Sequence, residues 1–151
     1  MKIIVAGGVK VANKKIYTIS IIIRTKNEEE WIGRCLETVF GQKTKHKLEV
    51  IIVDNESTDY TVKIAKRFPI AKLLKIKKFL PGKALNKGIK ASKGDYIVCT
   101  SAHCIPENQI WIETLVANFT DKTIAGVYGR QLPLSYTQPS DKRDLLITFG
   151  L

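Results

Sequence analysis

The sequence predicts an α/β domain with a mostly parallel sheet flanked by helices. Short apolar runs of strand length alternate with longer segments in which apolar residues recur at the helical period, as in successive βαβ units. The chain has 151 residues, 44% of them hydrophobic, which is enough for one domain with its own core. Two of the apolar runs end in polar and acidic clusters, as expected where parallel strands meet a ligand-binding edge.

The first strand and helix are predicted at Ile19–Arg24 and Glu28–Phe40. The strand is mostly apolar, with three consecutive isoleucines, which is typical of a strand buried on both faces. Asn27 is expected to be the N-cap of the helix, with acidic residues in the first turn, where they favour the helix dipole. The predicted buried face follows the 3.6-residue period and comprises Trp31, Ile32, Cys35, Leu36, Val39 and Phe40.

The second pair is a strand at Leu48–Val53 and a helix at Thr58–Phe68. The strand is again mostly apolar, with Glu49 near its start. Ser57 or Thr58 is expected to cap the helix, because their hydroxyls accept hydrogen bonds from free backbone N–H groups. Pro69 then stops the helix, since proline cannot donate a backbone hydrogen bond.

The same alternation continues through the second half. Strands are predicted at Ala71–Ile76, Tyr96–Thr100 and Ile124–Tyr128 from their short apolar runs. Helices are predicted at Pro81–Ser92, which opens with a proline at its first position, and at Glu107–Phe119, which has apolar residues at helical spacing.

Basic residues outnumber acidic ones by 25 to 14, which gives a net charge of +11. No acidic residue lies between Asp59 and Asp95. Such a block attracts a diphosphate, an acidic glycan, anionic lipid or nucleic acid, although a solvated basic face would look the same. Nucleic-acid binding is not expected, because the block lacks interleaved aromatic residues. The basic residues are Lys63, Lys66, Arg67, Lys72, Lys75, Lys77, Lys78, Lys83, Lys87, Lys90 and Lys93.

The three cysteines have no C-x-x-C spacing. Cys35 on an apolar helix face and Cys99 inside a strand are both predicted to be core thiols, and a zinc site that includes Cys104 is rejected because no second ligand pair exists at the required spacing. No apolar run approaches the ~20 residues of a membrane helix. We therefore expect a cytoplasmic protein, with peripheral contact to an anionic membrane left open.

Three segments carry a resemblance to a known family. Thr25–Glu28 reads Thr-Lys-Asn-Glu after the first strand, and Asp54–Asp59 reads Asp-Asn-Glu-Ser-Thr-Asp after the second. The glycine, alanine and asparagine spacing of Gly82–Gly94 is the third segment. From about Ile19 to Leu132 the chain resembles the family-2 glycosyltransferases, which are inverting, nucleotide-sugar-dependent enzymes of the GT-A type with a Rossmann-like fold. The family usually has Asp and Gly where Asn55 and Glu56 stand.

The resemblance implies a binding site for a nucleotide diphosphate sugar at the carboxyl edge of the sheet. It implies transfer of a hexosyl or deoxyhexosyl group to a glycan or lipid-linked acceptor in cell-surface polysaccharide synthesis. The residues implied around the nucleoside are Arg24, Thr25, Asn27, Glu28 and Asp54, with Glu56 and Ser57 in the same loop. Those implied near the diphosphate are Lys83, Asn86, Ser101 and His103.

The metal position departs from the family. Where its members carry Asp-x-Asp for a divalent ion, this chain reads Ser101-Ala102-His103. Mg²⁺ and Mn²⁺ favour carboxylate oxygens, although a neutral histidine nitrogen also binds Mn²⁺. His103 is therefore the one remaining metal ligand, a direct donor to the diphosphate, or a loop histidine with a structural hydrogen bond.

A catalytic base is also missing from the expected context. Inverting transfer needs a carboxylate to deprotonate the acceptor, and after Arg130 the only acidic residues are Asp141 and Asp144. The chain thus resembles the donor-binding half of such an enzyme, apparently truncated. The alternative is a non-catalytic nucleotide-binding or interaction module, and homo-oligomerisation stays open in either case.

Three regions are expected along the chain. Residues 1–16 form an N-terminal extension, in which a Gly-Gly hairpin between Ile3–Ala6 and Val9–Ala12 is favoured over a dinucleotide-binding turn, since the third glycine of that motif is absent. Residues 17–131 form the nucleotide-sugar-binding core. Residues 132–151 are the start of an acceptor half or a tail, with no assigned element.

Overall fold

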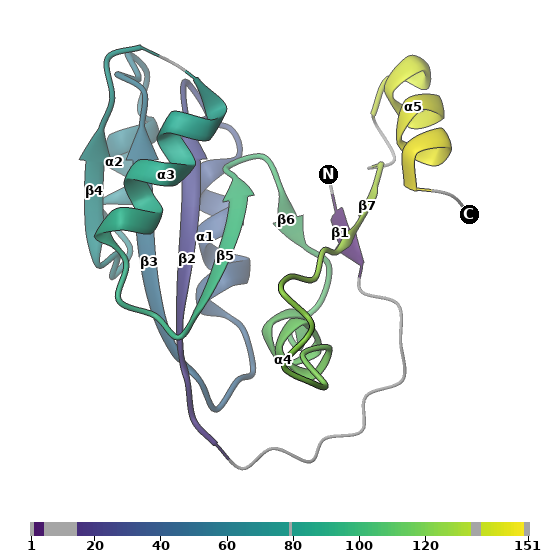
Figure 1. Cartoon of the computed structure of the whole chain (residues 1–151). Helices are drawn as coiled ribbons and strands as arrows, with labels where there is room; N and C mark the ends of the chain where they lie inside the picture. The colour runs from purple at the N-terminus through teal and green to yellow at the C-terminus, as the bar shows by residue number, and fades with distance from the viewer. Residues whose placement is uncertain (1, 5–14, 79, 134–136, 150–151) are drawn as a thin grey trace.

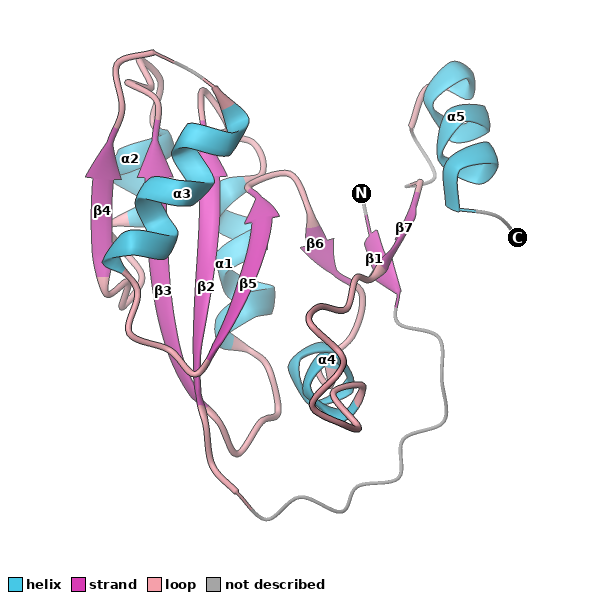
Figure 2. Ribbon diagram, in the orientation of Figure 1, coloured by secondary structure: helices cyan, strands magenta, loops and turns pink. Residues whose placement is uncertain are grey.

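The computed structural model describes residues 2–4, 15–78, 80–133 and 137–149 and confirms an α/β fold with a parallel main sheet (Figure 1). The strand order in this sheet is β4-β3-β2-β5, with every neighbouring pair parallel. All four carboxyl ends therefore lie along one edge, at the top of Figure 2. The strands are β2 (Thr18–Thr25), β3 (Lys47–Asp54), β4 (Lys72–Lys75) and β5 (Tyr96–Ser101).

The two central strands are apolar because both of their faces are covered. Ile21 and Ile23 of β2 belong to a cluster on one face of the sheet, while Ile22 belongs to a second cluster on the other face. All three side chains are fully buried. A strand buried on both sides reads as an uninterrupted apolar run, and the prediction of this strand is confirmed to within one residue at each end.

Helices cover both faces of the main sheet (Figure 2). Helices α1 (Ile32–Phe40) and α2 (Thr61–Ala65) lie on one face, and α3 (Pro81–Ala91) lies on the other. Gly88 lets α3 approach the sheet closely, because a Cβ atom at this position would lie 2.2 Å from Cγ2 of Ile22.

The remaining elements form a second group beside β5. A small sheet has the order β6-β1-β7, with β1 parallel to β6 and antiparallel to β7. Helix α4 (Trp111–Ala117) contributes Trp111, Ile112 and Leu115 to the larger core cluster. The other elements are β1 (Lys2–Ile4), β6 (Ile105–Pro106), β7 (Arg130–Leu132) and α5 (Pro139–Phe149). The hairpin expected between Ile3–Ala6 and Val9–Ala12 falls mostly outside the described residues.

The predicted strand at Ile124–Tyr128 is wrong. This segment is irregular, and the nearby strand is β7, which pairs with β1 and not with the main sheet. Its half-buried apolar residues, Ile124 and Val127, are three positions apart, whereas a strand needs an alternation of period two. Tyr128 is 85% exposed, and Gly126 offers no side chain to pack.

One of the two predictions of a core thiol, that for Cys99, is also wrong. Cys35 is fully buried, and burial raises the pKa of its thiol to about 12, with Cys104 and Glu28 adding to the shift. Cys99, in contrast, is exposed. Its strand, β5, is an edge strand of the main sheet. Cys99 and the 43% exposed Ile97 lie on the face of the sheet that carries α3, but α3 does not cover them.

Candidate functional site

The loops that follow β2 and β3 are joined by Asn27. The Asn27 side-chain oxygen accepts from the Thr58 backbone N–H at 2.9 Å, and the Asn27 backbone N–H donates to Ser57 Oγ at 2.9 Å. Asn27 has a φ of 49°, a left-handed conformation that asparagine tolerates. The prediction that Asn27 caps α1 is therefore wrong, because the helix begins five residues later, at Ile32, and Asn27 bonds to the neighbouring loop.

Asp54 ends β3 and is bound within its own turn. Its side chain is only 1% exposed, and it accepts from Ser57 Oγ at 2.5 Å and from the Ser57 backbone N–H at 3.1 Å. Glu56 lies between them, exposed and with a φ of 50°. This geometry fixes the Asp54 carboxylate at the carboxyl edge of the sheet.

The predicted cap of α2 by Ser57 or Thr58 is wrong as well. The N-cap position is Tyr60, and Asp59 supplies the nearest side-chain acceptor, for the Thr61 N–H at 3.0 Å. Burial alone would raise the pKa of Asp59. Hydrogen bonds from Thr61 and from the Glu29 N–H outweigh burial and lower it. The Asp59 carboxylate therefore has a structural role, because it joins the loops that follow β2 and β3.

A third loop, after β5, contacts the first. Glu28 Oε1 lies 2.7 Å from Nδ1 of His103, although the two residues are 75 positions apart. The backbone on either side of His103 is fixed, since the Ala102 N–H donates to the Arg24 carbonyl at 3.1 Å and the Cys104 N–H donates to the Ser101 carbonyl at 2.9 Å.

Three buried polar atoms at this edge have no hydrogen-bond partner in the structure as described. They are Thr25 Oγ1 at the end of β2, Asn55 Oδ1 just after β3 and Thr100 Oγ1 near the end of β5. Buried polar atoms of folded proteins are nearly always hydrogen-bonded, so atoms left over at one edge are suited to a polar ligand. Thr100 was missed by sequence reasoning, although a threonine ending an apolar strand is the kind of signal that could have found it.

The residues expected near the diphosphate are only partly brought together. Ser101 is buried, at 6% exposure, and is paired in register with Arg24 of the next strand. Lys83 and Asn86 are exposed on the first turns of α3, which starts at the level of the carboxyl edge (Figure 1). Within the part of the chain that the structure describes, neither side chain bonds to another residue of the site.

The potential ligands for a divalent ion are few. In the described ranges, no group of three or more His, Cys, Asp and Glu side chains is arranged to hold a metal ion. Glu28 and His103 are in contact, and they are one carboxylate and one imidazole. Mg²⁺ is often held by one or two protein ligands plus the phosphates of a substrate, so this pair is compatible with a cation shared with a bound diphosphate.

A parallel sheet with polar loops converging on its carboxyl edge is the arrangement in which open α/β domains bind their ligands. A family model described as glycosyl transferase family 2 matches residues 20–146, and the chain belongs to that family. Together with the fold, this match confirms the family expected from the Thr-Lys-Asn-Glu and Asp-Asn-Glu-Ser-Thr-Asp segments.

Two characterised relatives are similar in sequence. A dolichyl N-acetyl-α-D-glucosaminyl phosphate 3-β-D-2,3-diacetamido-2,3-dideoxy-β-D-glucuronosyltransferase of Methanococcus voltae is 40% identical over 96 residues, which cover 59% of this chain and 30% of the relative. Glycosyltransferase AglE of Haloferax volcanii is 33% identical over 128 residues, which cover 81% of this chain and 41% of the relative. The chain thus spans less than half the length of these relatives.

A solved structure agrees in fold. The mannosyltransferase of Pyrobaculum calidifontis in complex with GDP-Man and Mn²⁺ has a TM-score of 0.71 at 24% sequence identity, over 93% of this chain and 42% of that one. The GT-A-type fold that the sequence predicted is thereby confirmed.

Proposed function

We propose that this chain binds the nucleotide of a nucleotide diphosphate sugar at the carboxyl edge of its main sheet. The observation that carries the proposal is the set of buried polar atoms there that lack partners among the described residues: Thr25 Oγ1, Asn55 Oδ1 and Thr100 Oγ1. Membership of glycosyl transferase family 2 supports it, as does the likeness in fold to an enzyme solved with GDP-Man.

In this proposal the loops after β2 and β3 hold the nucleoside. The Asp54 carboxylate would accept a hydrogen bond from the base or the ribose, and Arg24 would reach a phosphate in the bidentate geometry that a guanidinium favours. The residues assigned to this end are Arg24, Thr25, Asn27, Glu28, Asp54, Glu56 and Ser57. Those assigned to the diphosphate end are Lys83, Asn86, Ser101 and His103.

A divalent ion is compatible with the diphosphate end. His103 would hold Mn²⁺ or Mg²⁺ together with phosphate oxygens and water, which is how such cations commonly bridge a protein and a diphosphate. When bound, the ion would neutralise the charge that develops on the leaving diphosphate. Without it, His103 and Lys83 would offer hydrogen-bond donors to the same oxygens.

As an enzyme, the whole protein would transfer the sugar to a glycan or lipid-linked acceptor. The acceptor hydroxyl must lose a proton as it attacks the anomeric carbon, so a carboxylate base is needed in the acceptor half. The second candidate function is nucleotide binding without turnover. It is favoured by Ser101-Ala102-His103 in place of Asp-x-Asp, and hydrolysis or transfer of a bound donor sugar would exclude it.

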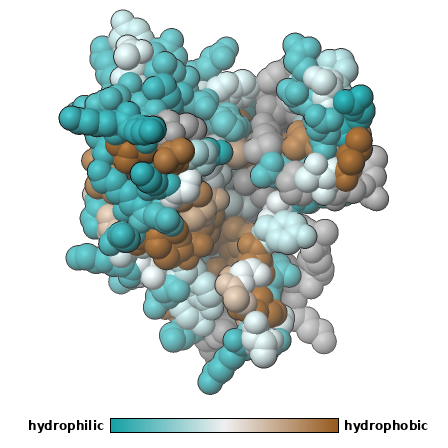
Figure 3. Space-filling view, turned by 45° about the horizontal axis from the view of Figure 1, so that its top comes forward, coloured by the Kyte–Doolittle hydropathy of each residue, from teal (hydrophilic) through white to brown (hydrophobic). Residues whose placement is uncertain are grey.

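We propose anionic lipid as a further partner, which the chain would contact at the membrane surface. Two contacts join lysines of β4 and α3 to the neighbouring element: Lys72 Nζ donates to the Ala91 carbonyl, and Lys87 Nζ donates to the Lys75 carbonyl. The part of Figure 3 over these elements carries many hydrophilic side chains, interrupted by apolar patches. Among the described residues, no helix is long and apolar enough to cross the bilayer.

Sedimentation with phosphatidylglycerol vesicles tests this contact. The chain should pellet with them at low salt and should stay in solution with phosphatidylcholine vesicles, because the attraction is electrostatic. The double variant K77E/K90E should bind less, whereas K43E/K122E, which changes two exposed lysines outside the block, should bind as the wild type does. Equal loss in both variants would show that total charge, and no particular surface, drives the binding.

The donor site is tested by thermal-shift titration with UDP, GDP, dTDP and CDP, each with and without Mn²⁺. One nucleotide should raise the melting temperature, since a ligand that binds only the folded state stabilises it. Asp54→Asn keeps an acceptor for Ser57 but removes the charge, and it should weaken binding by about tenfold, or 1.4 kcal/mol. Asp144→Asn, on exposed α5, is the matched control. Absence of a shift with every nucleotide would overturn the proposed donor site.

A further inference from the structure

The contact between Glu28 and His103 joins two loops that leave neighbouring strands. Glu28 follows β2 by three residues and His103 follows β5 by two, and these strands are paired in the sheet. The Glu28 Oε1 to His103 Nδ1 distance of 2.7 Å is that of a good charge-assisted hydrogen bond. The contact therefore sits at the carboxyl edge, where the donor nucleotide is proposed to bind.

The chemistry of the two groups assigns the nitrogen atoms of the ring. An ionised carboxylate can only accept, so the hydrogen of this bond is on Nδ1 of His103. The bond made by one ring nitrogen decides which task the other can perform. Nε2 is then the nitrogen that can face a ligand, with a lone pair for a cation in the neutral ring or an N–H for a phosphate oxygen in the imidazolium.

Of the two side chains, the Glu28 carboxylate is the more firmly held and the His103 imidazole is the more exposed to solvent. The Glu28 side chain is 19% exposed and the His103 side chain 46%. The backbone of Glu28 is also fixed, because its N–H donates to Thr61 Oγ1 at 2.7 Å and its carbonyl accepts from the Ile32 N–H at 2.8 Å. Glu28 is thus held by α1 and α2 before it contacts the ring.

His103 has little freedom apart from its side-chain torsions. Its two neighbours, Ala102 and Cys104, are buried and bonded to the sheet edge. The remaining variables are the rotations about Cα–Cβ and Cβ–Cγ, and the bond to Glu28 fixes them. An arrangement in which a carboxylate orients a histidine whose second nitrogen binds a ligand is common around metal ions.

We propose that Glu28 is a positioning residue that holds His103 with Nε2 toward the diphosphate of the donor. This inference rests on the proposed function. It moves Glu28 from the nucleoside end of the site, where the sequence assigned it, to the diphosphate end. If the pair had a purely structural role, its loss would change stability and leave nucleotide affinity unchanged.

Calorimetric titration with a nucleoside diphosphate and the matching monophosphate separates the two ends of the site. The probe is whichever of UDP, GDP, dTDP and CDP binds the wild-type chain most tightly, with and without Mn²⁺. Glu28→Ala should weaken diphosphate binding by about tenfold and leave monophosphate binding within about twofold. Glu28→Gln keeps an acceptor for Nδ1–H and should recover most of the loss. Glu30→Ala, an exposed glutamate of the same loop, is the control.

His103→Ala should cause the same loss as Glu28→Ala, and the double variant should lose no more than either, since the two residues act as one unit. A loss confined to the Mn²⁺ arm would mean that His103 acts through the cation, and an equal loss in both arms would mean a direct bond to phosphate. Additive losses, or equal losses for mono- and diphosphate, would overturn the inference. If the wild-type chain binds no nucleotide, the proposed function fails, and the inference fails with it.

Nitrogen NMR of the two histidine rings tests the geometry without any ligand. At a pH where both rings are neutral, His103 should carry its hydrogen on Nδ1. His46 should carry it on Nε2, because its Nδ1 accepts from the Tyr17 N–H at 3.2 Å. Glu28→Ala should abolish the Nδ1–H signal of His103 and leave His46 unchanged. An Nε2–H signal from His103 in the wild type would overturn the inference even if nucleotides bind.

Discussion

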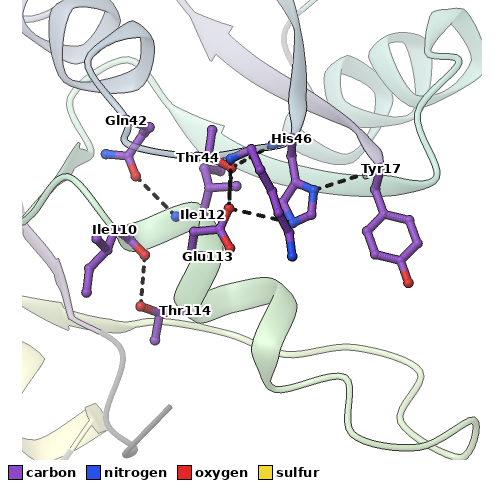
Figure 4. A network of polar contacts seen from close by, with 9 residues as sticks. Tyr17, Gln42, Thr44, His46, Ile110, Ile112, Glu113 and Thr114 are labelled. Carbon is purple, nitrogen blue, oxygen red and sulfur yellow. Dashed lines mark hydrogen bonds and ion pairs between the residues drawn. The ribbon is translucent and has the colours of Figure 1, made fainter. Parts of the chain in front are cut away.

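The Nε2 atom of His46 lies 3.7 Å from Oε1 of Glu113, where the start of β3 meets α4 at the end of the sheet opposite the candidate site (Figure 4). Glu113 also accepts from Thr44 Oγ1 at 2.6 Å and from the Lys45 N–H at 3.1 Å. His46 is buried, and its Nδ1 accepts from the Tyr17 backbone. His46 and Glu113 together therefore link the entry to β2, the entry to β3 and a helix of the second group.

The stability of the chain should fall on acidification because of His46. Burial lowers the pKa of this histidine, and the nearby Glu113 only partly opposes the shift. The unfolded chain therefore binds a proton more readily than the folded one, so stability is lost as the pH falls below the ordinary histidine pKa of about 6.5. Protonation would also place a hydrogen on Nδ1, against the Tyr17 N–H. Urea unfolding from about pH 7.5 to about pH 5 measures this effect.

The chain has two histidines, and the prediction concerns only the buried one, His46. His46→Gln should flatten the pH dependence over this range. Burial alone would raise the pKa of Glu113, but its hydrogen bonds from Thr44 and Lys45 and the nearby His46 lower it, so Glu113 contributes only at more acidic pH. An unchanged slope in His46→Gln would show that other groups cause the acid sensitivity.

Gly88→Ala should destabilise the fold by about 1–3 kcal/mol, the usual result of overpacking a core. The added methyl group would lie 2.2 Å from Ile22 Cγ2 and 3.1 Å from Val53 Cγ2. These two residues belong to the central strands β2 and β3, which cannot move away because both of their faces are packed. The matched control is Gly82→Ala in the same helix, where a Cβ would meet no atom within 4 Å. Alanine there should be neutral or should stabilise by up to about 1 kcal/mol, because it favours helix. Equal urea midpoints for the two variants would contradict close packing at Gly88.

The central strands were predictable from the sequence because their signal is local. Ile19–Arg24 and Leu48–Val53 are rich in isoleucine and valine, and β2 and β3 extend each prediction by only one residue at either end. The polar and acidic clusters that follow these two strands were predictable in the same way, because each cluster comes directly after its strand in the sequence.

The loops and short elements were not predictable, because contacts between distant residues fix them. Helix α2 starts at Thr61, later than expected, because the residues before it bond to Asn27 and Glu29, some 30 positions away. The pairing of β7 with β1 joins the two ends of the chain, and local periodicity carries no such information. The contact between Glu28 and His103 spans 75 positions in the same way.

Replacing Glu56 by glycine should stabilise the chain by up to about 1 kcal/mol. Glu56 is exposed and has a φ of 50°, a conformation that costs most L-residues about 1–2 kcal/mol and costs glycine almost nothing. Part of the gain is lost to the greater freedom of glycine in the unfolded chain. Thermal unfolding measures the difference. Glu37→Gly, at an exposed position inside α1, should instead destabilise by about 1 kcal/mol. A lower melting temperature for Glu56→Gly would mean that the glutamate side chain makes a stabilising contact.

Ser57→Ala should loosen the two loops that form the nucleoside end of the site. The Ser57 hydroxyl donates to Asp54 and accepts from the Asn27 N–H, so its removal breaks both bonds and leaves the Asp54 carboxylate with the backbone N–H alone. The free energy of unfolding should fall by about 1–2 kcal/mol in urea titrations.

Thr58→Ala is the matched control for this change. Its backbone bond to Asn27 remains, and the hydroxyl contact that it removes is long, at 3.5 Å, so its effect should stay below about 0.5 kcal/mol. Because Ser57 orients Asp54, Ser57→Ala should also weaken the proposed nucleotide binding, with mono- and diphosphate affected alike. Glu28→Ala, in contrast, should weaken the diphosphate only. A loss of stability without any change in affinity would mean that the Asp54 carboxylate does not contact the nucleotide.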